Sequence, residues 1–212
     1  DFMNKKSLIF IFIIIVLLVI FLCVFDFDKD STTSKKNNEN LNLLTGKYYV
    51  EMNIEKYGII KLELDADAAP ITVTNFINLV NDKFYDGLTF HRIIDGFMIQ
   101  GGGYEQTGER KNTKSIKGEF NSNGVVNTIS HKKGVISMAR TSVDKNSASS
   151  EFFIVQEDST FLDGDYAAFG YVIDGLDVVD KIAKKAKPTD DNGSIDIKDR
   201  PVIKYVKVID NK

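Results

Sequence analysis

The chain has 212 residues, of which 43% are hydrophobic and 27% are charged, and its 27 basic and 30 acidic residues give a formal charge of −3. This length and composition suffice for one folded domain with a full core once the N-terminus is set aside. The sequence has no concentrated basic stretch with interleaved aromatic residues, which argues against a nucleic-acid-binding protein.

Residues 8–25 form an apolar segment of eighteen residues, with two lysines before it and two aspartates soon after it. At 1.5 Å per residue, this length approaches the roughly 30 Å thickness of a bilayer core, so the segment is predicted to be a transmembrane helix that acts as a signal-anchor. The lysines favour a cytoplasmic location for residues 1–7 and an extracytoplasmic location for the rest. The alternative is a cleaved signal peptide and a secreted protein, although no small-x-small cleavage site follows the segment.

Residues 26–46 are dominated by Asp, Lys, Ser, Thr and Asn and are predicted to be a flexible polar linker. The single cysteine, Cys23, lies in the apolar segment, so the domain that follows has neither a disulfide nor a cysteine-based zinc site. The two histidines, His91 and His131, are forty residues apart and lack metal-ligand spacing. Neither a metal site nor a cofactor is therefore expected.

Residues 47–212 are predicted to be mostly β, with two helices. Apolar residues recur at helical spacing after Pro70 and again after Leu176, and each stretch predicts a helix. Eight stretches rich in β-branched and aromatic residues predict strands, which is the number needed for a closed antiparallel β-barrel with a filled interior. The predicted strands are residues 48–54, 58–64, 88–94, 97–102, 134–139, 152–156, 168–173 and 201–209. Residues 103–133 and 140–151 lack periodicity and are predicted to be loops.

Residues 90–102 carry the strongest functional signal. Two stretches of β-branched and aromatic residues flank the turn signal Asp95-Gly96, which predicts a tight β-hairpin. Side-chain alternation places Arg92 on one face with Phe90 and Ile94. An arginine among apolar neighbours must find a partner or a ligand, because an unpaired buried charge is very costly. The alternative is an arginine that reaches solvent at the margin of the sheet.

Four blocks, in one order and spacing, resemble the cyclophilins, which are peptidyl-prolyl cis-trans isomerases. They are FHRIIDGFMIQGG at 90–102, GVISMAR at 134–140, NSASSEFFI at 146–154 and FLDGDYAAFG at 161–170. The resemblance extends from Tyr48 to about Asp210. It implies a closed eight-stranded barrel capped by two helices, and an enzyme that isomerises X-Pro peptide bonds without a cofactor.

The resemblance also implies the residues of the site. Arg92 corresponds to the family's catalytic arginine, and Gln100 corresponds to the residue that orients this arginine and the substrate backbone. The implied substrate-binding residues are Phe97, Met98, Ala139, Arg140, Glu151, Phe153, Phe161, Leu162 and Tyr166.

Three of these positions depart from the best-known cyclophilins. Phe161 replaces a tryptophan, which implies weak cyclosporin binding because the indole N–H donor is lost. Tyr166 replaces a histidine, so one aromatic wall of the pocket is exchanged for another. Glu151 replaces a glutamine, and its carboxylate is expected to pair with Arg92 or Arg140.

Taken together, these features predict a membrane-anchored isomerase that acts on unfolded or exported proline-containing polypeptides. The richness in Lys, Asn and Ile favours a bacterial source with an AT-rich genome. The second hypothesis is a non-catalytic module, or a chaperone, that binds proline-containing peptides in the same groove.

Overall fold

The computed structural model describes residues 42–210. The predicted cytoplasmic residues 1–7, the predicted transmembrane segment, residues 8–25, and residues 26–41 of the predicted linker lie outside the described residues. Within residues 42–210, no helix is long and apolar enough to cross a membrane.

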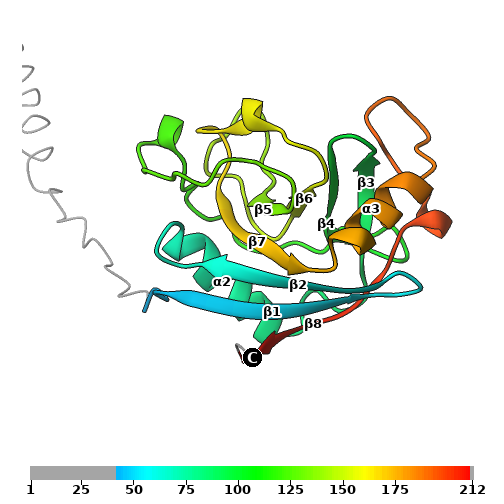
Figure 1. Ribbon diagram of the computed structural model, residues 1–212, viewed down its shortest axis with the longest axis horizontal. Coiled ribbons are helices and arrows are strands. Elements are labelled where there is room, and N and C mark those ends of the chain that lie inside the picture. The colour runs from blue at the N-terminus through cyan, green and yellow to red at the C-terminus, as the bar shows by residue number, and fades with distance from the viewer. Residues whose placement is uncertain (1–41, 211–212) are drawn as a thin grey trace, which may run out of the picture. The chain divides into compact units, whose positions relative to one another are not determined.

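Eight antiparallel strands form one curled sheet in the order β3-β4-β6-β5-β7-β2-β1-β8 (Figure 1). Strand β1 pairs with both β2 and β8, so the first and last strands of the domain are neighbours. All eight predicted strands are confirmed, with ends that differ by a few residues. The strands are β1 (Lys47–Ile54), β2 (Gly58–Asp65), β3 (Leu88–Ile94), β4 (Met98–Glu105), β5 (Val135–Met138), β6 (Phe152–Val155), β7 (Ala168–Asp174) and β8 (Ile203–Ile209).

The two outer strands, β3 and β8, do not pair along their length. They meet near one isolated bridge between Thr89 and Val202, where the Phe90 amide donates to the Pro201 carbonyl at 2.9 Å. Pro201 has no N–H to return this bond, so a regular ladder cannot extend through it. The sheet is therefore a curled half-barrel. The prediction of eight antiparallel strands is confirmed, whereas the predicted complete closure is not seen.

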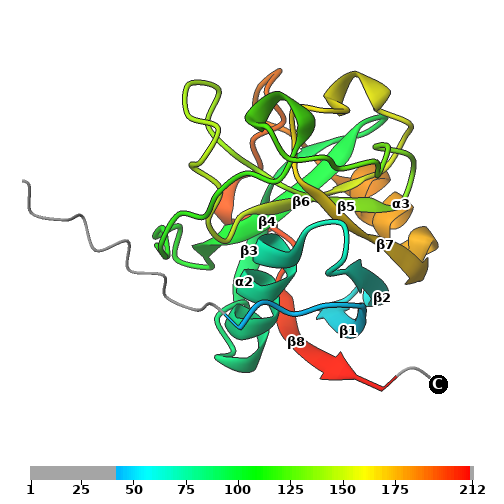
Figure 2. The same cartoon turned by 90° about the vertical axis from the view of Figure 1, so that its left-hand side faces the viewer.

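Both predicted helices are present, as α2 (Pro70–Asn81) and α3 (Leu176–Lys185). Figure 2 shows the helices well apart, with α2 alongside β8. Helix α2 begins with proline, whose fixed φ suits the first helical position. The preceding residue, Ala69, has no side chain that can cap the free N–H groups of the first turn.

The N-terminus of α2 is capped instead by Glu119, from the long segment between β4 and β5. One carboxylate oxygen accepts a hydrogen bond from the Ile71 amide at 3.0 Å. The other accepts from the Thr72 amide at 2.8 Å and from the Thr72 hydroxyl at 2.7 Å. Glu119 is only 2% exposed, so this buried negative charge satisfies the helix donors and interacts favourably with the helix dipole.

A β-bulge at His91 decides which way Arg92 faces. Phe90 and Arg92 lie opposite two successive residues of β4, so β3 has one residue more than β4 at this point. The extra residue shifts the alternation of side chains. Phe90 is fully buried in the main core, whereas Arg92 lines a surface cavity. The prediction that Arg92 and Phe90 share a face is therefore wrong.

Candidate active site

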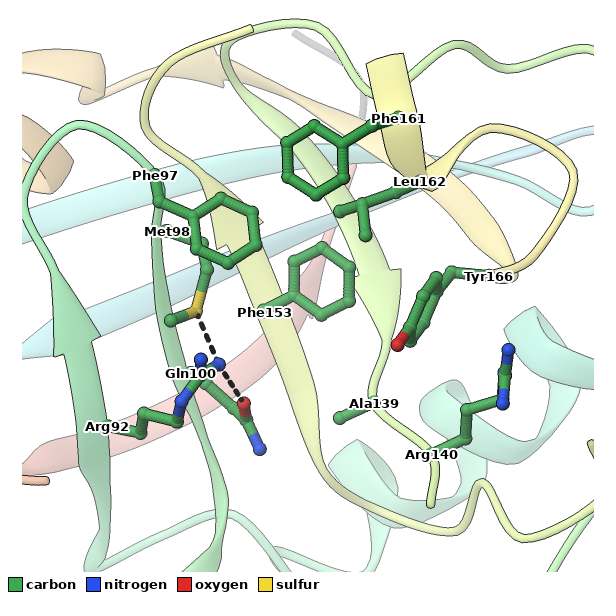
Figure 3. Close-up of a pocket in the computed structure, with 10 residues that line it drawn as sticks. All are labelled: Arg92, Phe97, Met98, Gln100, Ala139, Arg140, Phe153, Phe161, Leu162 and Tyr166. Atoms are coloured by element: carbon green, nitrogen blue, oxygen red, sulfur yellow. Dashed lines mark hydrogen bonds between the residues drawn. The ribbon is translucent and has the colours of Figure 1, made fainter. Parts of the chain in front are cut away.

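Ten of the eleven predicted site residues line a single cavity of about 300 Å³ (Figure 3). The exception is Glu151, which lines the neighbouring hollow instead. The ten residues are Arg92, Phe97, Met98, Gln100, Ala139, Arg140, Phe153, Phe161, Leu162 and Tyr166.

Three adjacent strands supply the centre of this cavity. Arg92 lies on β3, Met98 and Gln100 lie on β4, and Phe153 lies on β6 directly opposite Gln100. Because side chains alternate along a strand, Met98 and Gln100 point to the same side of the sheet. The hairpin therefore places one cation, one amide and one thioether side by side.

The floor of the cavity is apolar. Met98, Phe153 and Leu162 are 1%, 4% and 8% exposed and belong to a hydrophobic cluster distinct from the main core. At the rim, Phe161 is 71% exposed, and its ring centroid lies 5.5 Å from that of Phe97. The floor suits a small nonpolar group that enters from solvent, since burial of apolar surface is favourable there.

Arg92 is held by three contacts at the edge of this floor. Its Nη1 donates to Gln100 Oε1 at 3.2 Å and lies 3.7 Å from Met98 Sδ. Its Nε donates to the carbonyl oxygen of Asn192 at 2.7 Å. Partial burial lowers the pKa of Arg92, and Tyr166 and Asp190 oppose this shift. The guanidinium nevertheless remains cationic at neutral pH, because its ordinary pKa exceeds 12.

Gln100 is itself oriented by Glu151. The Gln100 Nε2 donates to Glu151 Oε2 at 3.1 Å, and Glu151 Oε1 accepts from Arg110 Nη2 at 2.9 Å. A carboxylate can only accept and a guanidinium can only donate, so the Gln100 amide has one satisfied orientation between them. The prediction that Glu151 pairs with Arg92 or Arg140 is wrong. Gln100 lies between Glu151 and Arg92 and contacts both. The other carboxylate oxygen of Glu151 accepts from Arg110.

Asn192 and Arg110 are contacts of the site that the sequence did not reveal. Asn192 contributes a backbone carbonyl, which has no side-chain signature. Its turn lies against β3, where the Ile93 amide donates to the Gly193 carbonyl at 2.8 Å. Gly193 has φ +84°, and a Cβ there would lie 2.7 Å from the Ile93 carbonyl oxygen. The Asn-Gly pair was therefore a signal of a tight turn, but not of its place beside Arg92.

His131 supports the cavity from beneath. Its Nδ1 lies 2.9 Å from Asp163 Oδ1 and its Nε2 lies 3.0 Å from Ser137 Oγ. Its ring stacks on Phe153 with centroids 6.0 Å apart. The order Ser–His–Asp resembles a hydrolase triad, but Ser137 is fully buried and cannot reach a substrate. Burial lowers the pKa of His131 against the opposing effect of Asp163, so the ring acts as a neutral structural support.

His91 is expected to make the stability of the domain dependent on pH. Its ring is largely buried, with Nδ1 lacking a hydrogen-bond partner among the described residues and Nε2 3.5 Å from Glu151 Oε2. Burial lowers the pKa of His91 to about 4, although Glu151 opposes the shift. As pH falls below about 6.5, His91 becomes protonated in the unfolded chain, whereas in the folded domain it stays neutral until about pH 4.

The free energy of unfolding is therefore expected to decrease between pH 6.5 and pH 4, with His91 contributing about 3 kcal/mol. Urea unfolding at several pH values measures this decrease. The His91→Asn variant should show a shallower pH dependence than the wild type, whatever its stability at pH 7. Equal slopes for the two proteins would contradict the assignment to His91.

Comparisons with known proteins agree with this geometry. A family model described as cyclophilin type peptidyl-prolyl cis-trans isomerase/CLD matches residues 49–210. Peptidyl-prolyl cis-trans isomerase A of Dickeya dadantii is 47% identical over 133 residues, which cover 60% of this chain and 67% of the relative. Peptidyl-prolyl cis-trans isomerase cyp18 of Streptomyces antibioticus is 40% identical over 163 residues, or 73% of this chain and 93% of the relative.

Solved structures give the same result. A crystal structure of a Cryptosporidium parvum cyclophilin-type isomerase aligns with a TM-score of 0.65 and 26% identity, over 79% of this chain and 100% of that chain. A second structure of that protein, in the presence of the dipeptide Ala-Pro, aligns with a TM-score of 0.63 and 28% identity, over 77% of this chain and 99% of that chain.

Proposed function

The chain belongs to the cyclophilin-type peptidyl-prolyl cis-trans isomerases, and from the composition of its N-terminal segment we propose that it is a membrane-anchored bacterial form that acts on exported polypeptides. Its activity is the isomerisation of X-Pro peptide bonds. The observation that carries the proposal for the site is a guanidinium fixed beside a small apolar cavity.

The chemistry required of this site follows from the amide bond. Conjugation gives the X-Pro bond a rotational barrier near 18–20 kcal/mol, and uncatalysed isomerisation takes tens of seconds or longer. In the transition state the amide is twisted, its nitrogen is pyramidal and more basic, and its carbonyl has lost charge separation. An enzyme accelerates the reaction only by binding this twisted form more tightly than the planar form.

Arg92 is placed to bind the twisted form of the amide more tightly than the planar form. Gln100 and the Asn192 carbonyl occupy Nη1 and Nε, while Nη2 has no hydrogen-bond partner among the described residues. With the proline ring on the Phe153 floor, Nη2 would donate to the pyramidal nitrogen, whose lone pair becomes available only in the twisted form. One charge-assisted hydrogen bond contributes about 1.5–3 kcal/mol, which corresponds to roughly ten- to 150-fold in rate.

The apolar floor adds to the effect of Arg92. A twisted amide is less polar than a planar one, so removal from water costs it less. Ala139 at the opposite edge, with Gln100, would bind the peptide backbone around the proline, and Arg140 lines this edge. The Cryptosporidium parvum relative crystallised in the presence of the dipeptide Ala-Pro supports a proline-containing ligand for this protein.

The proposed membrane anchor rests on the composition of residues 8–25 and on the lysines before them. It would hold the domain on the extracytoplasmic side, where unfolded exported chains arrive. Membrane fractionation, followed by mass measurement of the mature N-terminus, tests this location. A protein in the membrane fraction that retains residues 8–25 supports the anchor, whereas a mature chain that begins after residue 25 supports the secreted form and overturns it.

Weak cyclosporin binding is proposed from Phe161, which offers an exposed aromatic ring without the N–H donor of an indole. Titration of the isomerase assay with cyclosporin checks this point. Inhibition as tight in the wild type as in a Phe161→Trp variant would contradict it.

A further inference from the structure

The Arg140 side chain makes hydrogen bonds and ring contacts within the protein. Its Nε donates to the Asp165 carbonyl at 2.8 Å, and its Nη1 donates to the Thr141 carbonyl at 2.9 Å. The guanidinium carbon lies 4.6 Å from the ring centroid of Tyr166 and 5.3 Å from that of Phe120. Phe120 is 1% exposed, so Arg140 connects the rim of the cavity to the main core.

Tyr166 depends on ring contacts for its orientation. Among residues 42–210, its hydroxyl makes no hydrogen bond. Its ring meets Phe153 edge-on with centroids 5.8 Å apart and meets His131 edge-on at 6.5 Å. Figure 3 shows the Arg140 guanidinium beside Tyr166, on the side away from Phe153. The wall of the pocket is thus a half-buried ring that lies between the floor and a cation.

The segment that carries Tyr166 is anchored on either side of Gly164. On one side, the Asp163 carboxylate accepts from the Ser130 hydroxyl at 2.6 Å and from the His131 amide at 2.7 Å. On the other side, the Asp165 carbonyl accepts from Arg140. Without Arg140, the Asp165 carbonyl would lose its side-chain hydrogen bond and the Tyr166 ring would lose the cation that lies over it.

From these contacts we propose that Arg140 is a positioning residue, which holds Tyr166 as the wall of the proline pocket. The planar guanidinium can stack on a ring while it donates to two carbonyls, which a lysine cannot do. The inference rests on the proposed use of the cavity for proline and assigns Arg140 a role that acts through Tyr166. Figure 3 shows Arg140 across the cavity from Arg92, so its loss should weaken binding of the substrate and not the chemical step.

Steady-state kinetics of the full-length chain test this role. Arg140→Ala is expected to raise KM by roughly five- to thirtyfold with kcat nearly unchanged, because the lost contact affects the ground state and the transition state alike. Arg140→Lys keeps the charge near Tyr166 but not the paired hydrogen bonds, so it should restore part of the affinity. Lys207→Ala, which removes an exposed cation from β8, is the charge control and should leave KM unchanged.

A double-mutant cycle separates positioning from direct contact with the substrate. In a Tyr166→Ala background, Arg140→Ala should raise KM by less than twofold, because the residue through which it acts is already gone. The same rise in KM in both backgrounds would mean that Arg140 binds the substrate itself, which overturns the proposal. A lower thermal midpoint with unchanged KM would show a purely structural role and would overturn it as well. Loss of kcat in Arg92→Ala tests the proposed function separately.

Discussion

The Arg92→Ala variant is expected to have a kcat/KM roughly ten- to 150-fold below that of the wild type, with its fold intact. Arg92 supplies the charged donor of the cavity, because the other cation among the ten lining residues, Arg140, lies across the cavity from it. The fold should survive because Arg92 is half-buried at the margin of the sheet and is not part of either hydrophobic cluster. A protease-coupled assay with a proline-containing tetrapeptide measures the change.

Arg92→Lys is the matched control, because it keeps the charge but cannot donate to both the Asn192 carbonyl and Gln100 from a planar group. Its activity should lie between those of the wild type and the alanine variant. Undiminished activity in Arg92→Ala would show that the protein does not use this guanidinium. Complete absence of acceleration in the wild type would favour the non-catalytic binding module.

The Glu119→Ala variant is expected to lose about 2–4 kcal/mol of unfolding free energy. The carboxylate accepts three hydrogen bonds from Ile71 and Thr72 at the start of α2. Since Glu119 is buried, removal of its carboxylate leaves these donors with neither a protein partner nor water. Urea denaturation monitored by circular dichroism measures the loss.

Glu119→Gln separates the charge from the hydrogen bonds. The amide has the same shape but only one acceptor oxygen, so an intermediate loss of stability is expected. A Glu119→Ala variant within 0.5 kcal/mol of the wild type would contradict the assigned cap. The catalytic parameters of the folded Glu119 variants should remain close to those of the wild type, because α2 does not line the cavity.

The strands and helices were predictable because each is a local pattern. Alternating apolar residues define β1 and β2, and Pro70 followed by helical spacing defines α2. The residues of the cavity were predictable for another reason, which is that they fall in four blocks resembling one family. That resemblance placed Phe161 and Tyr166 beside Arg92 although about seventy residues separate them in the chain.

What the sequence could not reveal depends on contacts between distant segments or on backbone atoms. The bulge at His91 is a property of how β3 pairs with β4, and it reversed the predicted face of Phe90. The cap of α2 comes from Glu119, about fifty residues away. The partner of Glu151 proved to be Arg110, from a region predicted only as a loop. In each case the local sequence fits several arrangements, and tertiary packing selects one.

The pairing of β1 with β8 also affects how the domain folds. Tyr49 lies opposite Ile209, so the sheet is completed by residues from the two extremes of the domain. Contacts of such long sequence separation slow the search for the native state. Until β8 has been synthesised, β1 has one edge without a partner, and an unpaired edge can recruit another chain. A chain shortened before β8 should therefore self-associate instead of forming a smaller working domain, although every residue of the cavity would be present.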